Sequence, residues 1–209
     1  MIGLLGGTFD PIHFGHLRIA LEVADALDLE QVRFIPNRVP PHRRQPLASG
    51  AERLAMIQSA IQGEPRFVAD DRELRQEQTS YTVHTLQALH QEFPHQSWAF
   101  IIGADAFLQL TSWYEWQTLF DLTHFIVVGR PGYALTTSET TWFQPYLVDS
   151  LADLTKHTVG KVLVLNIQGL DISATQLRNL IARGQSPRYL TPDAVWSMIQ
   201  TQQLYKSKV

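Results

Sequence analysis

The feature that most constrains the fold is a pair of adjacent glycines, Gly6 and Gly7, directly after a short apolar run at residues 2–5. Apolar residues then recur at helical spacing between residues 16 and 29, and residues 32–35 are again apolar and strand-like. The order strand, glycine turn, helix, strand is typical of a parallel β-α-β unit. The chain is therefore expected to begin with a β-turn-α-β unit.

The same alternation continues through the rest of the chain. Further strands are expected at 97–102, 124–128 and 161–167, and further helices at 49–62, 80–92, 113–120, 173–183 and 191–204. The last of these helices is expected to have Thr191 as its N-cap and Pro192 at its first helical position. Residues 133–160 carry no strong period. This pattern predicts an α/β fold built on an open parallel sheet, followed by a small helical appendage.

Composition excludes several classes of protein. With 17 Lys and Arg against 20 Asp and Glu among 209 residues, the formal net charge is -3. The chain therefore lacks the positive field of a general nucleic-acid binder or of a protein that binds anionic membranes. There is no cysteine, and no apolar run approaches the ~20 residues of a membrane span. No basic leader precedes the first apolar residues, and we expect a cytoplasmic protein that binds neither nucleic acid nor membrane.

The first candidate site is the glycine turn itself, GGTFDPIHFGH at 6–16. In parallel sheets, ligands gather at the carboxyl ends of strands, where glycines allow close approach and a helix N-terminus attracts phosphate. His13 and His16 are three residues apart, so they are expected on one helix face, pointing toward that pocket. Glycine turns and paired histidines also occur for structural reasons alone, and only their combination at one junction favours a functional site.

The second candidate site follows the last expected strand, in the segment DISATQLR at 171–178. Ser173 with Gln176 forms a capping-box pattern at a helix start. The hydroxyls of Ser173 and Thr175 and the guanidinium of Arg178 can all donate to phosphate oxygens. From these residues alone, an ordinary N-cap beside a solvated arginine is the simpler interpretation.

Taken together, these segments resemble the HxGH nucleotidyltransferase superfamily and, more closely, the bacterial nicotinate-nucleotide adenylyltransferases. The similarity spans nearly the whole chain and is carried by an ordered set of motifs: GGTFDPIHFGHL (6–17), PPHR (40–43), SYTVHTL (80–86), IGADAFLQLTSWYEW (102–116), VVGRPG (127–132), ISATQLR (172–178) and the ending SPRYLTPDAVWSMIQTQQLY (186–205). The resemblance implies a Rossmann-like open parallel sheet with helices on both faces. It also implies a nucleotide-binding α/β domain at 1–170 and a C-terminal helical subdomain at 171–209, packed on it as one structural unit.

The reaction implied by the resemblance is adenylyl transfer from ATP to nicotinate mononucleotide, giving deamido-NAD and pyrophosphate, a step of NAD biosynthesis. No covalent protein intermediate is expected, because the 5′-phosphate of the mononucleotide attacks the α-phosphorus. Mg²⁺ is the expected cofactor, held mainly by the ATP phosphates and by no dedicated set of protein ligands. The sequence leaves the oligomeric state open, with a homo-oligomer as one option.

The resemblance also assigns roles to individual residues. His13, His16 and Arg178 are the expected catalytic residues, and cationic donors would fit that role. ATP is expected to bind to Gly6, Gly7, Thr8, Phe9, Asp105, Ser173 and Thr175. Nicotinate mononucleotide is expected to bind to Arg43, Thr82, Trp113, Tyr114 and Arg130. In that site the indole of Trp113 would stack on the pyridinium ring and the two arginines would face the phosphate.

Three positions depart from the family pattern: His84 stands in place of an aspartate, Arg43 of a lysine and Ala174 of a serine. Three alternatives also stay open. The first is an adenylyltransferase that prefers nicotinamide mononucleotide or phosphopantetheine, and the second is a binding module that has kept the nucleotide pocket but lost turnover. The third, a metalloenzyme using His84, His90 and His95, lacks a recognisable ligand spacing.

Overall fold

The computed structural model describes residues 1–38, 45–76, 79–129 and 142–206. Its centre is a seven-stranded sheet in the order β3-β2-β1-β4-β5-β7-β6, in which every pair of neighbouring strands is parallel. The strands are β1 (Ile2–Gly7), β2 (Gln31–Pro36), β3 (Phe67–Ala69), β4 (Trp98–Gly103), β5 (His124–Gly129), β6 (Leu147–Val148) and β7 (Val162–Asn166). The predicted open parallel sheet is thus confirmed, and the short edge strands β3 and β6 are additions to it.

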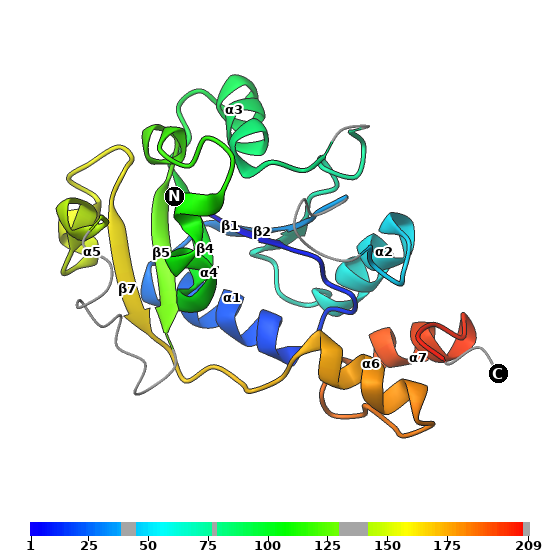
Figure 1. Ribbon diagram of the computed structural model, residues 1–209. Coiled ribbons are helices and arrows are strands. Elements are labelled where there is room, and N and C mark those ends of the chain that lie inside the picture. The colour runs from blue at the N-terminus through cyan, green and yellow to red at the C-terminus, as the bar shows by residue number, and fades with distance from the viewer. Residues whose placement is uncertain (39–44, 77–78, 130–141, 207–209) are drawn as a thin grey trace.

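Five of the described α-helices lie between strands in the chain, and the last two follow the final described strand. The helices are α1 (Phe14–Ala26), α2 (Gly50–Ala60), α3 (Thr82–Glu92), α4 (Ala104–Leu108), α5 (Leu151–Leu154), α6 (Ala174–Ala182) and α7 (Asp193–Thr201), with 3₁₀ turns η1 (Leu110–Ser112), η2 (Thr118–Asp121) and η3 (Gln144–Tyr146). In Figure 1 the strands form the middle of the molecule, and α6 and α7 lie beside the end of α1 at which that helix begins.

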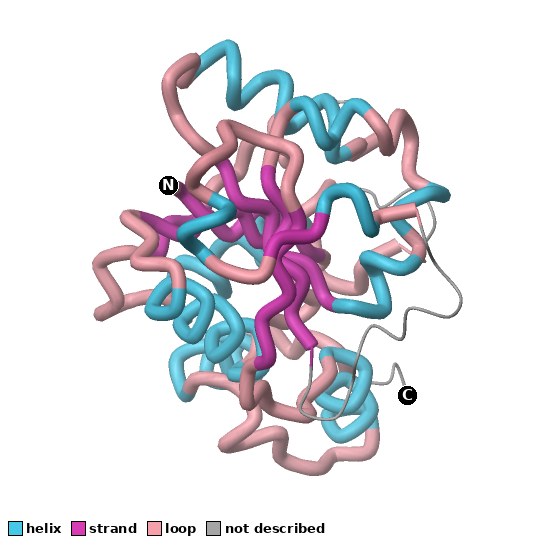
Figure 2. The backbone as a smooth tube through the Cα atoms, turned by 90° about the vertical axis from the view of Figure 1, so that its left-hand side faces the viewer, coloured by secondary structure: helices cyan, strands magenta, loops and turns pink. Residues whose placement is uncertain are grey.

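Two hydrophobic clusters cover the two faces of the sheet. Because side chains alternate along a strand, Leu4 and Phe100 belong to one cluster while their neighbours Leu5 and Ile101 belong to the other. The cluster of Leu5 includes residues of α1, α2, α6 and α7, and the cluster of Leu4 includes residues of α3 and α4. Helices therefore cover both faces, as Figure 2 shows from the side.

The C-terminal helices share this core with the rest of the chain. Ile181 of α6 and Val195 and Ile199 of α7 are buried in the same cluster as Met56 and Ile57 of α2. The appendage is thus packed on the sheet domain, whereas a domain boundary at residue 170 stays a prediction.

Two local predictions are wrong. The helix expected at 113–120 is absent. An extended residue at Trp113 follows η1, and η2 begins at Thr118. Packing of Trp113 on Phe100 and of Trp116 on Trp142 outweighs the local helical pattern. Thr191 does not cap α7, whose N-cap is Pro192. Its hydroxyl instead donates to the carbonyl oxygen of Ile12, 2.8 Å away.

Candidate active site

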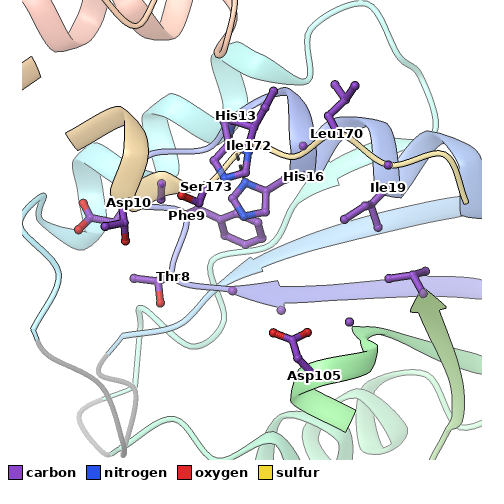
Figure 3. Close-up of a pocket in the computed structure, with 18 of the residues that line it drawn as sticks. Thr8, Phe9, Asp10, His13, His16, Ile19, Asp105, Leu170, Ile172 and Ser173 are labelled. Carbon is purple, nitrogen blue, oxygen red and sulfur yellow. Dashed lines mark hydrogen bonds between the residues drawn. The ribbon is translucent and has the colours of Figure 1, made fainter. Parts of the chain in front are cut away.

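The candidate site lies at the carboxyl ends of β1 and β4, the two neighbouring strands at the centre of the sheet. From β1 the chain adds strands toward one edge, and from β4 it adds strands toward the other. In open parallel sheets this is where ligands bind. A cavity of about 930 Å³ opens there. Its walls come from the turn after β1, the start of α4, the end of β5 and the start of α6. Figure 3 shows Ser173 near the histidine pair and Asp105 on the far side of the end of β1.

All ten residues expected to be catalytic or to bind ATP line this single cavity: Gly6, Gly7, Thr8, Phe9, His13, His16, Asp105, Ser173, Thr175 and Arg178. The two candidate sites of the sequence, which are about 160 residues apart, therefore face the same space. That arrangement is the one the resemblance requires, because a triphosphate must be held from both sides.

The two imidazoles form a stacked pair at the start of α1. Their ring centroids are 3.7 Å apart with an interplanar angle of 26°, and the edge of Phe9 packs on His16 with centroids 5.0 Å apart. The backbone N–H of His13, the N-cap residue, donates to Nδ1 of His16 at 3.3 Å. Since Nδ1 of His16 accepts a hydrogen bond here, the neutral ring carries its own proton on Nε2.

Burial keeps both rings neutral in the free protein. It lowers the pKa of His13 from its usual 6.5 to about 4. His16 is partly open to the cavity but enclosed by protein, and burial followed by repulsion from His13 holds its pKa well below 6.5. In the free protein the imidazoles are therefore neutral N–H donors at pH 7, and the expectation of cationic donors stays a prediction for the nucleotide-bound state.

Gly15, between the two histidines, is needed for close packing and was not among the expected site residues. A Cβ at this position would lie 2.9 Å from Nδ1 of His13 and 3.2 Å from the carbonyl oxygen of Ile172. Only a glycine lets α1 approach both the histidine ring and the segment before α6. The sequence does contain a signal for this role, because a glycine lies between the two histidines in the segment His13 to His16.

Arg178 connects the two walls of the cavity. Its Nη1 donates to the carbonyl oxygen of Asp10 at 2.6 Å, and its Nη2 donates to Oγ1 of Thr175 at 3.0 Å. Ser173 is the predicted N-cap of α6 and accepts from the backbone N–H of Gln176 at 3.2 Å. The simpler interpretation of this segment, a cap with a solvated arginine, therefore describes Ser173 but not Arg178.

Asp10 is a buried anchor of the glycine turn that sequence reasoning missed. Its carboxylate accepts from the backbone N–H groups of Leu47 and Ala48 at 2.8 and 3.1 Å and from the hydroxyl of Tyr205 at 2.8 Å. Burial and the adjacent carboxylate raise the pKa of Tyr205, so the phenol stays a donor. Arg53, also buried, donates from Nη1 to the carbonyl oxygen of Thr8 at 2.7 Å.

Of the residues expected to bind nicotinate mononucleotide, the three that the structure describes, Thr82, Trp113 and Tyr114, are not among those that line this cavity. Tyr114 packs on Tyr81, with ring centroids 4.7 Å apart, and Tyr81 directly precedes Thr82. Trp113 contacts Phe100 edge to face at 6.2 Å between centroids. A Cβ on Gly6 would lie 3.5 Å from the same Phe100 ring, so Trp113 is one side chain away from the glycine turn.

His84, one of the departures from the family pattern, belongs to the same aromatic group, with its ring 5.7 Å from Tyr81 and 5.9 Å from Tyr114. Arg43 and Arg130 lie outside the described residues. Thr82, Trp113 and Tyr114 are therefore brought together near one another, beside the cavity and not within it.

Asp105 is the acidic residue of the cavity whose oxygens suit a hydrated Mg²⁺. Its Oδ1 would lie 2.9 Å from a Cβ on Gly103, so the carboxylate sits directly over the end of β4. In the described part of the chain, no three His, Cys, Asp or Glu side chains gather in a way that could hold a metal ion. This fits an ion that takes most of its ligands from substrate phosphates and water.

The contact of His90 also disfavours the metalloenzyme alternative, because its Nε2 lies within hydrogen-bond distance of the carbonyl oxygen of Leu122, at 2.6 Å.

Within the described residues, none of the helices has the length and apolarity needed to cross a membrane.

The fold and the cavity between the glycine turn and α6 fit a nucleotidyltransferase, and the profile of the Cytidylyltransferase-like family matches residues 4–180. A "Probable nicotinate-nucleotide adenylyltransferase" of Aeromonas salmonicida is 43% identical over 208 residues, covering 99% of this chain and 97% of the relative. One of Marinobacter nauticus is 45% identical over 208 residues, covering 98% and 96%. The chain belongs to the nicotinate-nucleotide adenylyltransferase family.

A solved structure supports the fold at greater evolutionary distance. The nicotinic acid mononucleotide adenylyltransferase of Plasmodium falciparum, complexed with NaAD, superposes with a TM-score of 0.73 at 18% identity, covering 98% of this chain and 96% of that one. The overall arrangement of the sheet and its C-terminal helices is thus shared well beyond recognisable sequence similarity.

Proposed function

We propose that the protein transfers the adenylyl group of ATP to nicotinate mononucleotide, forming deamido-NAD and pyrophosphate in NAD biosynthesis. The observation that carries this proposal is the cavity in which the histidine pair after β1 faces Ser173, Thr175 and Arg178 of α6. The reaction needs two polyanions aligned and the charge on the α-phosphate and on the departing pyrophosphate stabilised. A cavity with donors on opposite walls meets that requirement.

In this proposal, the glycine turn brings backbone close to the triphosphate, and Nε2 of His16 donates to a phosphate oxygen. The arriving negative charge raises the pKa of both imidazoles, so they gain positive charge as the substrate binds. Arg178, already fixed between Asp10 and Thr175, presents its guanidinium to the same phosphates from the other wall. Bound Mg²⁺ would neutralise phosphate charge, with Asp105 holding its water shell or the ribose hydroxyls.

The mononucleotide is assigned to the neighbouring aromatic group. Trp113 offers an indole face to the cationic pyridinium ring, and backbone N–H groups near Thr82 and Tyr114 would bind the carboxylate. Arg43 and Arg130 are assigned to the mononucleotide phosphate on the strength of the resemblance. A homo-oligomeric state and a cytoplasmic location stay predictions from the sequence.

The deciding experiment measures pyrophosphate release from ATP with nicotinate mononucleotide, nicotinamide mononucleotide or phosphopantetheine as acceptor. We expect release that depends on nicotinate mononucleotide and on Mg²⁺. Equal or reversed preference for nicotinamide mononucleotide would reject the substrate assignment. Nucleotide binding without any release would favour the non-catalytic binding module.

A further inference from the structure

The segment that joins α6 to α7 holds the backbone on both sides of His13. On one side, the hydroxyl of Thr191 donates to the carbonyl oxygen of Ile12 at 2.8 Å. On the other side, the N–H of Phe14 donates to the carbonyl oxygen of Leu190 at 3.0 Å. Two successive residues near the end of the chain therefore fix the two peptide groups that flank a histidine near its beginning.

These contacts are shielded from water. Thr191 is 1% exposed and Ile12 is fully buried. A hydrogen bond in such a place meets little competition from solvent, and a carbonyl left there without its donor is costly. The N–H of Phe14 belongs to the first turn of α1, where no partner exists within the helix, so Leu190 satisfies a group that the helix leaves open.

The hydroxyl of Thr191 bonds to Ile12 and does not cap a helix. Directly before Pro192 and α7, its hydroxyl would be suited to cap the helix. The structure has Pro192 as N-cap and the hydroxyl on Ile12 instead. The first turn of α7 thus has no side-chain cap, and the hydroxyl of Thr191 instead forms a hydrogen bond to the residue before His13.

The backbone around this contact is held in uncommon conformations. Phe9 in the glycine turn has φ of 48°, and Tyr189 directly before Leu190 has φ of 67°. Residues with a side chain adopt this left-handed region only when their surroundings hold them there. The glycine turn before Ile12 and the segment before Leu190 therefore each contain a residue whose conformation the surrounding structure must maintain.

We propose that Thr191 is a positioning residue for adenylyl transfer: its hydroxyl, together with the Leu190 carbonyl, fixes the backbone that presents the stacked His13 and His16 rings to the cavity. This inference rests on the proposed function of the two histidines. It assigns the C-terminal segment a part in the reaction although Thr191 itself does not line the cavity. A displacement of about 1 Å in such a group lowers turnover by up to about 10²-fold.

The test compares Thr191→Val with Thr123→Val. Both remove one buried hydroxyl that donates to a backbone carbonyl, since Oγ1 of Thr123 donates to Trp98 at 3.0 Å. Thr123 directly precedes β5 and so lies at the amino end of the parallel strands, whereas the site lies at their carboxyl ends. We expect Thr191→Val to lower kcat by about 10-fold or more, with KM for nicotinate mononucleotide unchanged, and Thr191→Ser to restore it. Thr123→Val should keep wild-type kcat.

A second readout does not depend on turnover: the titration of the imidazoles, followed by ¹⁵N NMR in each folded variant. If the turn loosens in Thr191→Val, solvent reaches His13 and its pKa moves from about 4 toward 6.5, whereas Thr123→Val leaves it in place. Equal kcat in the two valine variants, or an unchanged His13 titration in Thr191→Val, would overturn the inference. If the wild-type protein releases no pyrophosphate, the proposed function fails, and the titration alone still decides whether Thr191 positions the histidines.

Discussion

The most specific physical consequence of the site is a dependence of stability on pH that arises from His13. The side chain is 4% exposed, and burial lowers its pKa from 6.5 to about 4. Between these values the unfolded chain binds more protons at this position than the folded protein does. The free energy of unfolding therefore rises with pH across this window. The stability that depends on a neutral His13 is fully retained above pH 6.5 and is lost as the solution is acidified toward pH 4.

The size of the effect follows from the two pKa values. For one group with a pKa of about 4 folded and 6.5 unfolded, lowering the pH from 7 to 5 removes about 2 kcal/mol of stability. His13→Asn removes the titrating ring at an N-cap position where asparagine is well tolerated. The wild-type protein should lose about 2 kcal/mol more than this variant between pH 7 and pH 5.

The assay is urea unfolding of both proteins at pH 7, 6 and 5, without nucleotide. His95→Asn is the control, because it removes an exposed imidazole whose surroundings change little on folding. The remaining titrating groups are common to the wild-type protein and the variant. Removal of the His13 ring also removes one cause that lowers the pKa of His16, which enlarges the expected difference. Parallel loss of stability in wild type and His13→Asn would refute the claim that burial keeps this ring neutral.

Three further predictions concern turnover. His16→Ala should lower kcat by about 10²- to 10³-fold, the usual cost of losing one donor to a developing phosphate charge, with little change in melting temperature; near-normal turnover would discard its assignment. Gly15→Ala should lower kcat because its Cβ would lie 2.9 Å from Nδ1 of His13, whereas in the control Gly50→Ala the Cβ would meet only the flexible end of Leu74 at 3.0 Å; similar kcat in both variants would contradict this reasoning. Trp113→Ala should raise KM for nicotinate mononucleotide by about 5- to 30-fold, for a cation–π contact of about 1–2 kcal/mol, and leave KM for ATP unchanged; a parallel rise in both would place the indole elsewhere.

Local sequence signals were sufficient wherever the contacts that decide the structure lie within a few residues. Ser49 and Glu52 form the capping box that the spacing predicts, with bonds of 3.2 and 2.6 Å between side chain and backbone. Ser173 likewise caps α6. The apolar runs of β1, β2, β4, β5 and β7 were recognisable because each strand is buried in the sheet.

Local signals failed where a distant segment decides the outcome. The segment around Trp113 follows a helical pattern, but Trp113 packs on Phe100 of β4 and Trp116 packs on Trp142, both outside the segment. The edge strands β3 and β6 are only three and two residues long, too short to carry a period, and form because a neighbouring strand offers its hydrogen-bonding edge.

The sequence by itself determined the order of elements, the parallel sheet and which motif residues line the cavity, because motif and period are properties of neighbouring residues. The tertiary structure alone decided the charge state of the histidine pair and the anchoring of the turn that carries it. Asp10 meets Tyr205 across 195 positions, and Ile12 meets Thr191 across 179. Both burial and such bonds exist only once the two ends of the chain have folded against each other, so no local pattern can encode them.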